Sequence, residues 1–204
     1  MTYSTMGQLV LVGAGNMGGA MLTGWLKSGV PGSSVTVIDP GPSEAMLTQI
    51  ADAGATYVRE VPADLKAGIL FLALKPQVMA AVLPGLKSLV GPGTVVVSVA
   101  AGKTLAFMEE QLGAAAMVRA MPNTPAMIGR GVTGAFANAA VSAEQRDIVH
   151  RLLKVSGPVE WLEGEEQINA VTAVSGSGPA YVFYLVECMA EAGRKAGLQA
   201  DLAM

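Results

Sequence analysis

The segment from Leu9 to Gly18 constrains the fold of this chain most strongly. An apolar run, Leu-Val-Leu-Val, leads directly into Gly13-x-Gly15-x-x-Gly18, and a helical pattern follows at once. In a strand–turn–helix unit that holds a dinucleotide pyrophosphate, Gly13 allows the tight turn, Gly15 lets the backbone approach the phosphates, and Gly18 lets helix and strand pack closely. The free N–H groups at the helix start then face the anion. We therefore expect a nicotinamide-dinucleotide site here. The alternative is a glycine-rich turn without a ligand.

Composition excludes several classes of protein. The chain has 204 residues, of which 51% are hydrophobic and 14% charged, so it has a large core and is not disordered. A net charge of −3 without a basic cluster argues against a nucleic-acid partner. No apolar run is long enough to span a membrane, and residues 1–8 lack the parts of a secretory signal. Since Cys188 is the only cysteine, we expect a cytoplasmic protein, and we expect no metal site.

Strand and helix patterns alternate along most of the chain. This alternation predicts an α/β fold, namely a doubly wound, Rossmann-type parallel sheet with helices on both faces. The expected strands are residues 9–13, 35–39, 56–58, 69–74, 94–99, 116–121, 132–137 and 158–162. The expected helices are residues 17–28, 43–53, 77–89 and 142–154. Ser142 followed by Gln145 predicts a capping box at the start of the last of these helices.

The pattern changes after residue 162. We expect a helix at residues 167–174, a break at residues 175–179 and a long apolar helix at residues 180–196. We therefore divide the chain into a dinucleotide-binding domain, residues 1–162, and the beginning of an all-α domain, residues 163–204. On the long helix we expect core packing of three aromatic residues and of the cysteine. These residues are Tyr181, Phe183, Tyr184 and Cys188.

Asp39 ends the second expected strand, where a carboxylate can accept hydrogen bonds from both adenosine ribose hydroxyls. The same charge repels the 2′-phosphate of NADP, and no Arg or Lys lies between Asp39 and Arg59 to bind that phosphate. These features favour NADH without excluding NADPH. The alternative is that Asp39 serves only the turn formed with Pro40 and Gly41.

Three more strands end in loops that we expect at the same edge of the sheet as the glycine turn. Small side chains at Ala100 and Ala101 allow a flat nicotinamide ring to approach the backbone. Asn123 lies in a proline-stiffened loop and can bind the carboxamide or a ribose. Lys75 is either part of this edge or simply a solvated strand end. The sole histidine, His150, lies on an amphipathic helix away from this edge, and we expect it to be structural.

The sequence lacks an evident proton acceptor for a hydroxyl substrate. The three loops contain no histidine, and residues 176–193 contain no basic residue, where a β-hydroxyacid dehydrogenase carries a catalytic lysine. A protonated imine is already electrophilic, so its reduction depends on positioning more than on acid catalysis. This absence favours a C=N substrate.

Five segments in this order resemble the pyrroline-5-carboxylate reductase family. They are residues 12–18, 74–77, 97–102, 119–126 and 174–181, and the most specific are Met-Pro-Asn-Thr-Pro and Ser-Gly-Ser-Gly-Pro-Ala-Tyr. The resemblance implies NAD(P)H-dependent reduction of 1-pyrroline-5-carboxylate to L-proline, the last step of proline biosynthesis. It also implies a homo-oligomer formed through the helical domain, which contributes to substrate binding and dimerisation.

The resemblance also implies which residues bind ligands. The cofactor-binding residues are Val12, Gly13, Ala14, Gly15, Asn16, Met17, Gly18, Asp39, Ala73, Leu74, Lys75, Pro76, Val99, Ala100, Ala101 and Asn123. The substrate-binding residues are Glu165, Ser175, Gly176, Ser177 and Gly178. The family's Ser-Pro-Gly-Gly-Thr-Thr loop, which holds the substrate carboxylate and ring nitrogen, is not within these 204 residues, so no catalytic residue is assigned.

Because that loop is not within these 204 residues, we expect the 204-residue polypeptide alone to bind cofactor and to turn over substrate poorly or not at all. Two other functions stay open. One is a non-catalytic or truncated dinucleotide-binding module. The other is a different imine or keto reductase of the same superfamily.

Overall fold

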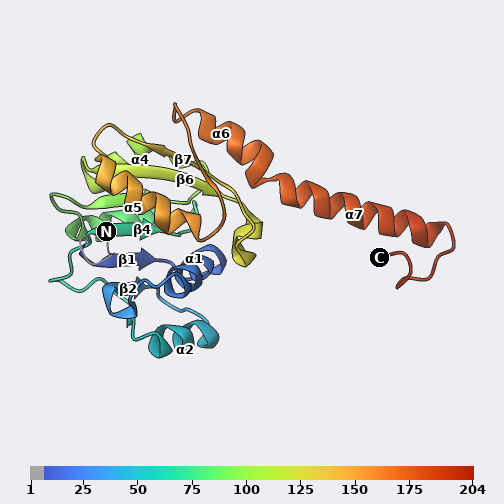
Figure 1. Cartoon of the computed structure of the whole chain (residues 1–204), viewed down its shortest axis with the longest axis horizontal. Coiled ribbons are helices and arrows are strands. Elements are labelled where there is room, and N and C mark those ends of the chain that lie inside the picture. Colours follow the sequence, from blue (N-terminus) through green and yellow to red (C-terminus); the bar gives the residue numbers. More distant parts are fainter. Residues whose placement is uncertain (1–6) are drawn as a thin grey trace.

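A computed structural model describes residues 7–204 as an eight-stranded sheet, helices on both of its faces and a long helix that leaves the body (Figure 1). The strand order is β3-β2-β1-β4-β5-β6-β7-β8. The strands are β1 (Leu9–Val12), β2 (Val35–Ile38), β3 (Thr56–Val58), β4 (Ile69–Leu72), β5 (Val95–Ser98), β6 (Ala116–Pro122), β7 (Thr133–Ala137) and β8 (Val159–Trp161). The helices are α1 (Asn16–Lys27), α2 (Glu44–Asp52), α3 (Met79–Leu86), α4 (Leu105–Leu112), α5 (Ala143–Lys154), α6 (Gln167–Val171) and α7 (Gly178–Lys195).

The sheet confirms the predicted doubly wound architecture. Strands β1 to β6 are mutually parallel, β7 runs antiparallel to β6, and β8 runs parallel to β7. Every residue of β1, β2, β4 and β5 is buried, as expected for largely apolar strands covered on both faces. Because β1 to β6 are parallel, the loops that follow them lie at one edge of the sheet.

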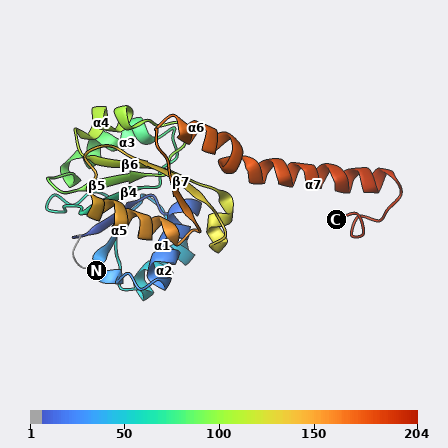
Figure 2. The same ribbon diagram turned by 45° about the horizontal axis from the view of Figure 1, so that its top comes forward.

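Helices α1, α2 and α5 cover one face of the sheet, and α3 and α4 cover the other (Figure 2). On the first face, the Trp25 ring packs edge-on against Phe71, with 4.9 Å between centroids. The Trp25 indole also donates a hydrogen bond of 2.9 Å to the carbonyl of Leu152 in α5. On the second face, Met79 of α3 and Met108 of α4 are fully buried. The two cores hold the glycine turn in place from both sides of β1.

Serine and threonine residues begin three of the helices. Ser43 and Thr104 accept hydrogen bonds from backbone N–H groups in the first turns of α2 and α4. The predicted capping box is confirmed at α5, where Ser142 binds the Gln145 N–H and the Gln145 side chain binds the Ser142 N–H. Helix α4 was not predicted, although Thr104 and Gly113 mark its start and end.

The predicted break at residues 175–179 is shorter in the structure, where only Ser177 lies outside a helix. A π-helical turn, Thr172–Gly176, connects α6 to α7, with Ser177 at the junction. The backbone N–H and the hydroxyl of Ser177 both donate to the Thr172 carbonyl, at 2.9 Å each. These two hydrogen bonds close the π-helical turn. A Cβ at Gly176 would lie 2.7 Å from Met121 Cε, so this glycine allows the turn to pack on β6. Gly178, in contrast, has nothing within 4 Å of its Cβ position and is the first residue of α7.

The expected core packing on α7 is also wrong. The exposed fractions of Tyr181, Phe183 and Tyr184 are 61%, 63% and 70%, and Cys188 is exposed as well. Helix α7 projects away from the sheet in both ribbon views, so these side chains have no core to enter (Figures 1 and 2). The boundary between domains at residue 162 stays a prediction, although β8 ends at Trp161 and only helices follow.

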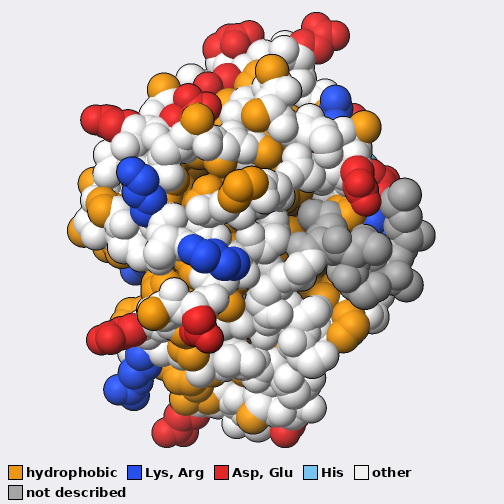
Figure 3. All heavy atoms as spheres, turned by 90° about the vertical axis from the view of Figure 1, so that its left-hand side faces the viewer, with side chains coloured by type: hydrophobic (Ala, Val, Ile, Leu, Met, Phe, Trp, Pro, Cys, Tyr) orange, Lys and Arg blue, Asp and Glu red, His pale blue; other side chains and the backbone are white. Residues whose placement is uncertain are grey.

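The surface opposite α7 carries acidic and basic side chains that are scattered among small apolar patches (Figure 3). No continuous basic area is present on this face, in keeping with the net charge of −3. Among residues 7–204, no helix combines the length and the apolar character that crossing a membrane requires.

Candidate cofactor groove at the carboxyl edge of the sheet

Two of the three glycines in the turn are required by packing. Gly13 has a φ of +91°, and a Cβ there would lie 2.6 Å from the carbonyl oxygen of Ala73. A Cβ at Gly18 would overlap the carbonyl oxygen of Gly13 and touch Ala73. The turn therefore fits tightly between β1, α1 and the end of β4, which brings Ala73 next to the glycine turn.

Gly15 is different because it faces open space. It is exposed, its φ is −70°, and a Cβ built on it would meet no described heavy atom within 4 Å. It is the N-cap residue of α1, and none of the described side chains caps this helix. The N–H groups and the positive dipole end of α1 are thus available to an anion next to Gly15.

A groove of about 410 Å³ extends from the glycine turn to the loop after β2. Its lining residues are Ala14, Gly15, Asn16, Gly19, Ala20, Thr23, Asp39, Gly41, Pro42, Ser43, Met46 and Met127. None of them is a lysine or an arginine. The exposed Met127 comes from the short 3-10 turn Thr124–Ile128 after β6 and had not been expected in the site.

Asp39 is fixed at one end of this groove by two backbone hydrogen bonds. Its Oδ2 accepts from the N–H of Ala14 at 2.7 Å, and its Oδ1 accepts from the N–H of Gly41 at 2.8 Å. Each carboxylate oxygen retains a further lone pair for a ligand hydroxyl. Asp39 can therefore stabilise the turn at Pro40 and Gly41 and bind the ribose at the same time.

The other predicted cofactor residues lie at the same edge of the sheet. Val12 ends β1 beside Ala73, whose N–H donates to the Val12 carbonyl at 2.9 Å. Lys75 is exposed in the loop after β4, between the half-buried Leu74 and Pro76. After β5, the Val99 N–H donates to the Leu72 carbonyl at 3.1 Å. The small side chains of Ala100 and Ala101 follow directly.

Asn123 joins this edge to the helical segment. Its Oδ1 accepts from the Val132 N–H at 3.0 Å, and its Nδ2 lies 3.4 Å from the hydroxyl of Ser175 in the π-helical turn. The structure therefore brings together Asn123 and the segment predicted to bind substrate, Ser175 to Gly178. This contact links residues 52 positions apart, and no pattern in the sequence indicated it.

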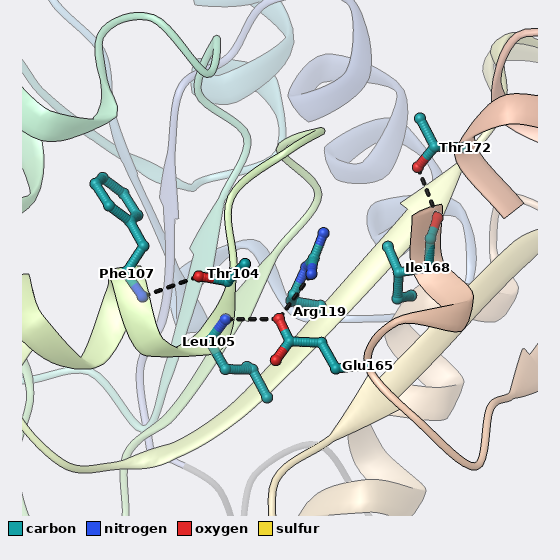
Figure 4. Close-up of polar contacts among 7 residues, drawn as sticks. All are labelled: Thr104, Leu105, Phe107, Arg119, Glu165, Ile168 and Thr172. Carbon is teal, nitrogen blue, oxygen red and sulfur yellow. Dashed lines mark hydrogen bonds and ion pairs between the residues drawn. The ribbon is translucent and has the colours of Figure 1, made fainter. Parts of the chain in front are cut away.

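Glu165 lies at the start of the helical segment and is held by the α/β body. Its Oε1 is 2.6 Å from Arg119 Nη1 and accepts the Leu105 N–H at 2.8 Å (Figure 4). Neither partner was expected from the sequence, although Arg119 belongs to one of the segments that carry the family resemblance. His150 is bound to the indole of Trp161 at 3.2 Å, in agreement with a structural role.

Comparisons with known proteins match both parts of the chain. A model of NADP oxidoreductases that are coenzyme F420-dependent matches residues 8–102, and a model of pyrroline-5-carboxylate reductase dimerisation matches residues 165–204. The chain is similar to pyrroline-5-carboxylate reductase from Pseudomonas aeruginosa, with 42% identity over 96% of this chain and 72% of the relative. The corresponding protein from Escherichia coli is 39% identical over 92% of this chain and 70% of the relative.

Solved structures agree with these matches. A pyrroline-5-carboxylate reductase from Coxiella burnetii superposes with a TM-score of 0.85 and 32% identity, covering 98% of this chain and 74% of that one. A pyrroline carboxylate reductase from Plasmodium falciparum with NADP bound gives a TM-score of 0.81 and 25% identity, covering 96% and 72%. With identity of this level along nearly its whole length, the chain belongs to the pyrroline-5-carboxylate reductase family.

Proposed function

We propose that this protein is an NAD(P)H-dependent oxidoreductase that reduces the C=N bond of 1-pyrroline-5-carboxylate to give L-proline, the last step of proline biosynthesis. The observation that carries the proposal is the groove formed by Gly15, the uncapped start of α1 and Asp39, in a chain 42% identical to a pyrroline-5-carboxylate reductase. The groove can be recognised as a dinucleotide site without the family's substrate-binding loop. The groups of the groove that would bind the dinucleotide are backbone N–H groups and one carboxylate.

The residues of the chain bind and orient the reactants. The bound nicotinamide supplies a hydride, that is, two electrons and one hydrogen, to the imine carbon; when the ring nitrogen is already protonated, the product is the amine and no further proton is required. The N–H groups at the start of α1 bind the pyrophosphate, and Asp39 binds the adenosine ribose. Residues 73–76 and 99–101 line the path to the nicotinamide, with Asn123 at its end. Residues 175–178 face the substrate.

The function is tested by NAD(P)H oxidation that depends on 1-pyrroline-5-carboxylate, followed through the absorbance of the reduced nicotinamide. We also expect proline-dependent reduction of the oxidised cofactor at high pH. Activity with a hydroxy acid and none with the imine would support the other reductase hypothesis. Saturable cofactor binding without imine turnover at any protein concentration would support the binding-module hypothesis.

We further propose a preference for NADH over NADPH, supported by Asp39 and by the absence of Lys and Arg from the groove lining. Replacing Asp39 with serine should weaken NADH binding by about 10- to 150-fold, since a hydrogen bond to a charged group contributes about 1.5–3 kcal/mol. NADPH affinity should fall less or rise, because the repulsion of its 2′-phosphate is lost. The measurement is the ratio of the two dissociation constants, with Asp52→Ser on the exposed end of α2 as the control. Tighter binding of NADPH than of NADH by the unmodified protein would refute the preference.

We also propose that the protein is a homo-oligomer assembled through α7. The supporting observations are the match of residues 165–204 to a dimerisation region and the exposed apolar side chains of this helix. The expectation of a cytoplasmic protein rests on the single cysteine and stays a prediction.

A further inference from the structure

Arg119 is a buried cation that depends on one carboxylate. Among residues 7–204 it is the only charged residue in the buried class, with 3% of its surface exposed. It lies on β6 opposite Ser98 of β5, on the face of the sheet that α4 covers. Burying a guanidinium is unfavourable without an ion pair of good geometry, and Glu165 Oε1 supplies it at 2.6 Å. The position of Glu165 is therefore set by the sheet.

The same oxygen atom also holds the start of α4. Glu165 Oε1 accepts the N–H of Leu105, the first residue of α4, at 2.8 Å (Figure 4). The loop at residues 99–104 is thus fixed at both ends, by β5 before it and by Glu165 after it. This is the loop whose first three residues line the proposed path to the nicotinamide.

Glu165 is in turn part of the helical segment. Its carbonyl accepts the Ile168 N–H at 3.1 Å, in the first turn that leads into α6. From α6 the chain passes through the π-helical turn to residues 175–178, where Ser175 lies beside Asn123. A single carboxylate oxygen therefore connects the sheet, the loop at residues 99–104 and the helix that carries the proposed substrate segment.

We propose that Glu165 is a positioning residue for hydride transfer, which holds the loop at residues 99–104 at a fixed distance from residues 175–178. The inference rests on the proposed function, because it assumes that the loop faces the nicotinamide and that residues 175–178 face the substrate. Hydride transfer is sensitive to alignment, and a misplacement of about 1 Å costs about 100-fold in rate. The pyrophosphate and ribose contacts belong to the glycine turn and Asp39, so cofactor affinity does not depend on Glu165.

The test compares three variants of the full-length protein. Glu165→Ala should lower kcat by about 100-fold while the Kd for NADH changes by less than about threefold. Glu165→Gln keeps an oxygen that accepts from both Leu105 and Arg119, and it should restore most of the lost kcat. Glu166→Ala removes the same charge from the neighbouring exposed position and should behave like the unmodified protein.

A second measurement is independent of turnover. Hydrogen exchange at the Leu105 amide should become faster in Glu165→Ala and remain slow in Glu165→Gln and Glu166→Ala. Because Glu165→Ala leaves a buried cation unpaired, a double variant, Arg119→Met with Glu165→Ala, removes the cation as well and still deprives Leu105 of its acceptor. The double variant should show the same loss of kcat and the same faster exchange.

The outcomes separate the inference from the proposed function. If a folded Glu165→Ala or double variant has the kcat of the unmodified protein, Glu165 does not position the site. If Glu165→Gln loses as much kcat as Glu165→Ala, the carboxylate charge matters and positioning is refuted. If the unmodified protein does not reduce the imine, the proposed function fails, whatever the exchange of Leu105.

Discussion

Replacing Gly15 with valine is expected to lower NADH affinity by at least about 100-fold with little effect on stability. Two charge-assisted hydrogen bonds to the pyrophosphate, at about 1.5–3 kcal/mol each, correspond to a loss of this size. Stability should change little because the φ of −70° suits any residue and a Cβ at this position meets no described atom within 4 Å. The measurements are a fluorescence titration with NADH and a thermal unfolding curve.

Two other glycines provide matched comparisons for this variant. Gly85 lies on the exposed side of α3, away from the groove. The Gly85→Val variant should therefore bind NADH as the unmodified protein does. Gly18→Val should instead lower the stability of the protein. Its Cβ would overlap the Gly13 carbonyl and destabilise the contact between strand and helix. If Gly15→Val bound NADH with unchanged affinity, the glycine turn would not be the pyrophosphate site.

Replacing Trp25 with alanine is expected to cost about 3–5 kcal/mol of unfolding free energy. The indole is fully buried, packs edge-on against Phe71 and donates its N–H to Leu152, so one side chain joins α1, the sheet and α5. Trp25→Phe keeps most of the apolar volume but leaves the Leu152 carbonyl without this donor, and should cost about 1–3 kcal/mol. Urea unfolding measures both values.

The half-exposed position Leu47 on α2 serves as the reference for this experiment. Leu47→Ala should lower the unfolding free energy by no more than about 1.5 kcal/mol, because about a third of its surface is exposed. A loss of less than about 1 kcal/mol for Trp25→Ala would show that α1 and α5 do not depend on this contact. The prediction would then be wrong.

The sheet and the glycine turn could be predicted because their determinants are local. Runs such as Ile69–Leu72 are apolar at every position because both faces of the strand are covered, and this pattern is visible without knowledge of the neighbouring strands. The capping box at Ser142 needs only two residues three positions apart. Helix α4 was not predicted, although Thr104 and Gly113 are ordinary start and end signals for a helix.

Other features depend on contacts between residues far apart in the sequence. The ion pair between Arg119 and Glu165 joins positions 46 residues apart. The acidic sequence around Glu165 does not indicate this contact. The glycines near Gly176 resemble a break because glycine usually ends helices, whereas here one of them accommodates Met121. The tyrosines of α7 were expected in the core because the sequence shows that these side chains are apolar. It does not show which surface covers them.

The shape of α7 has a mechanical consequence. Its 18 residues form a rod about 27 Å long, and within the described chain Ala190 is its only buried residue, so the rod is supported mainly at its base beside the π-helical turn. A tilt of about 5° at that base moves the far end by about 2 Å. In a homo-oligomer assembled through α7, contacts with the partner along this helix would have to suppress such a tilt.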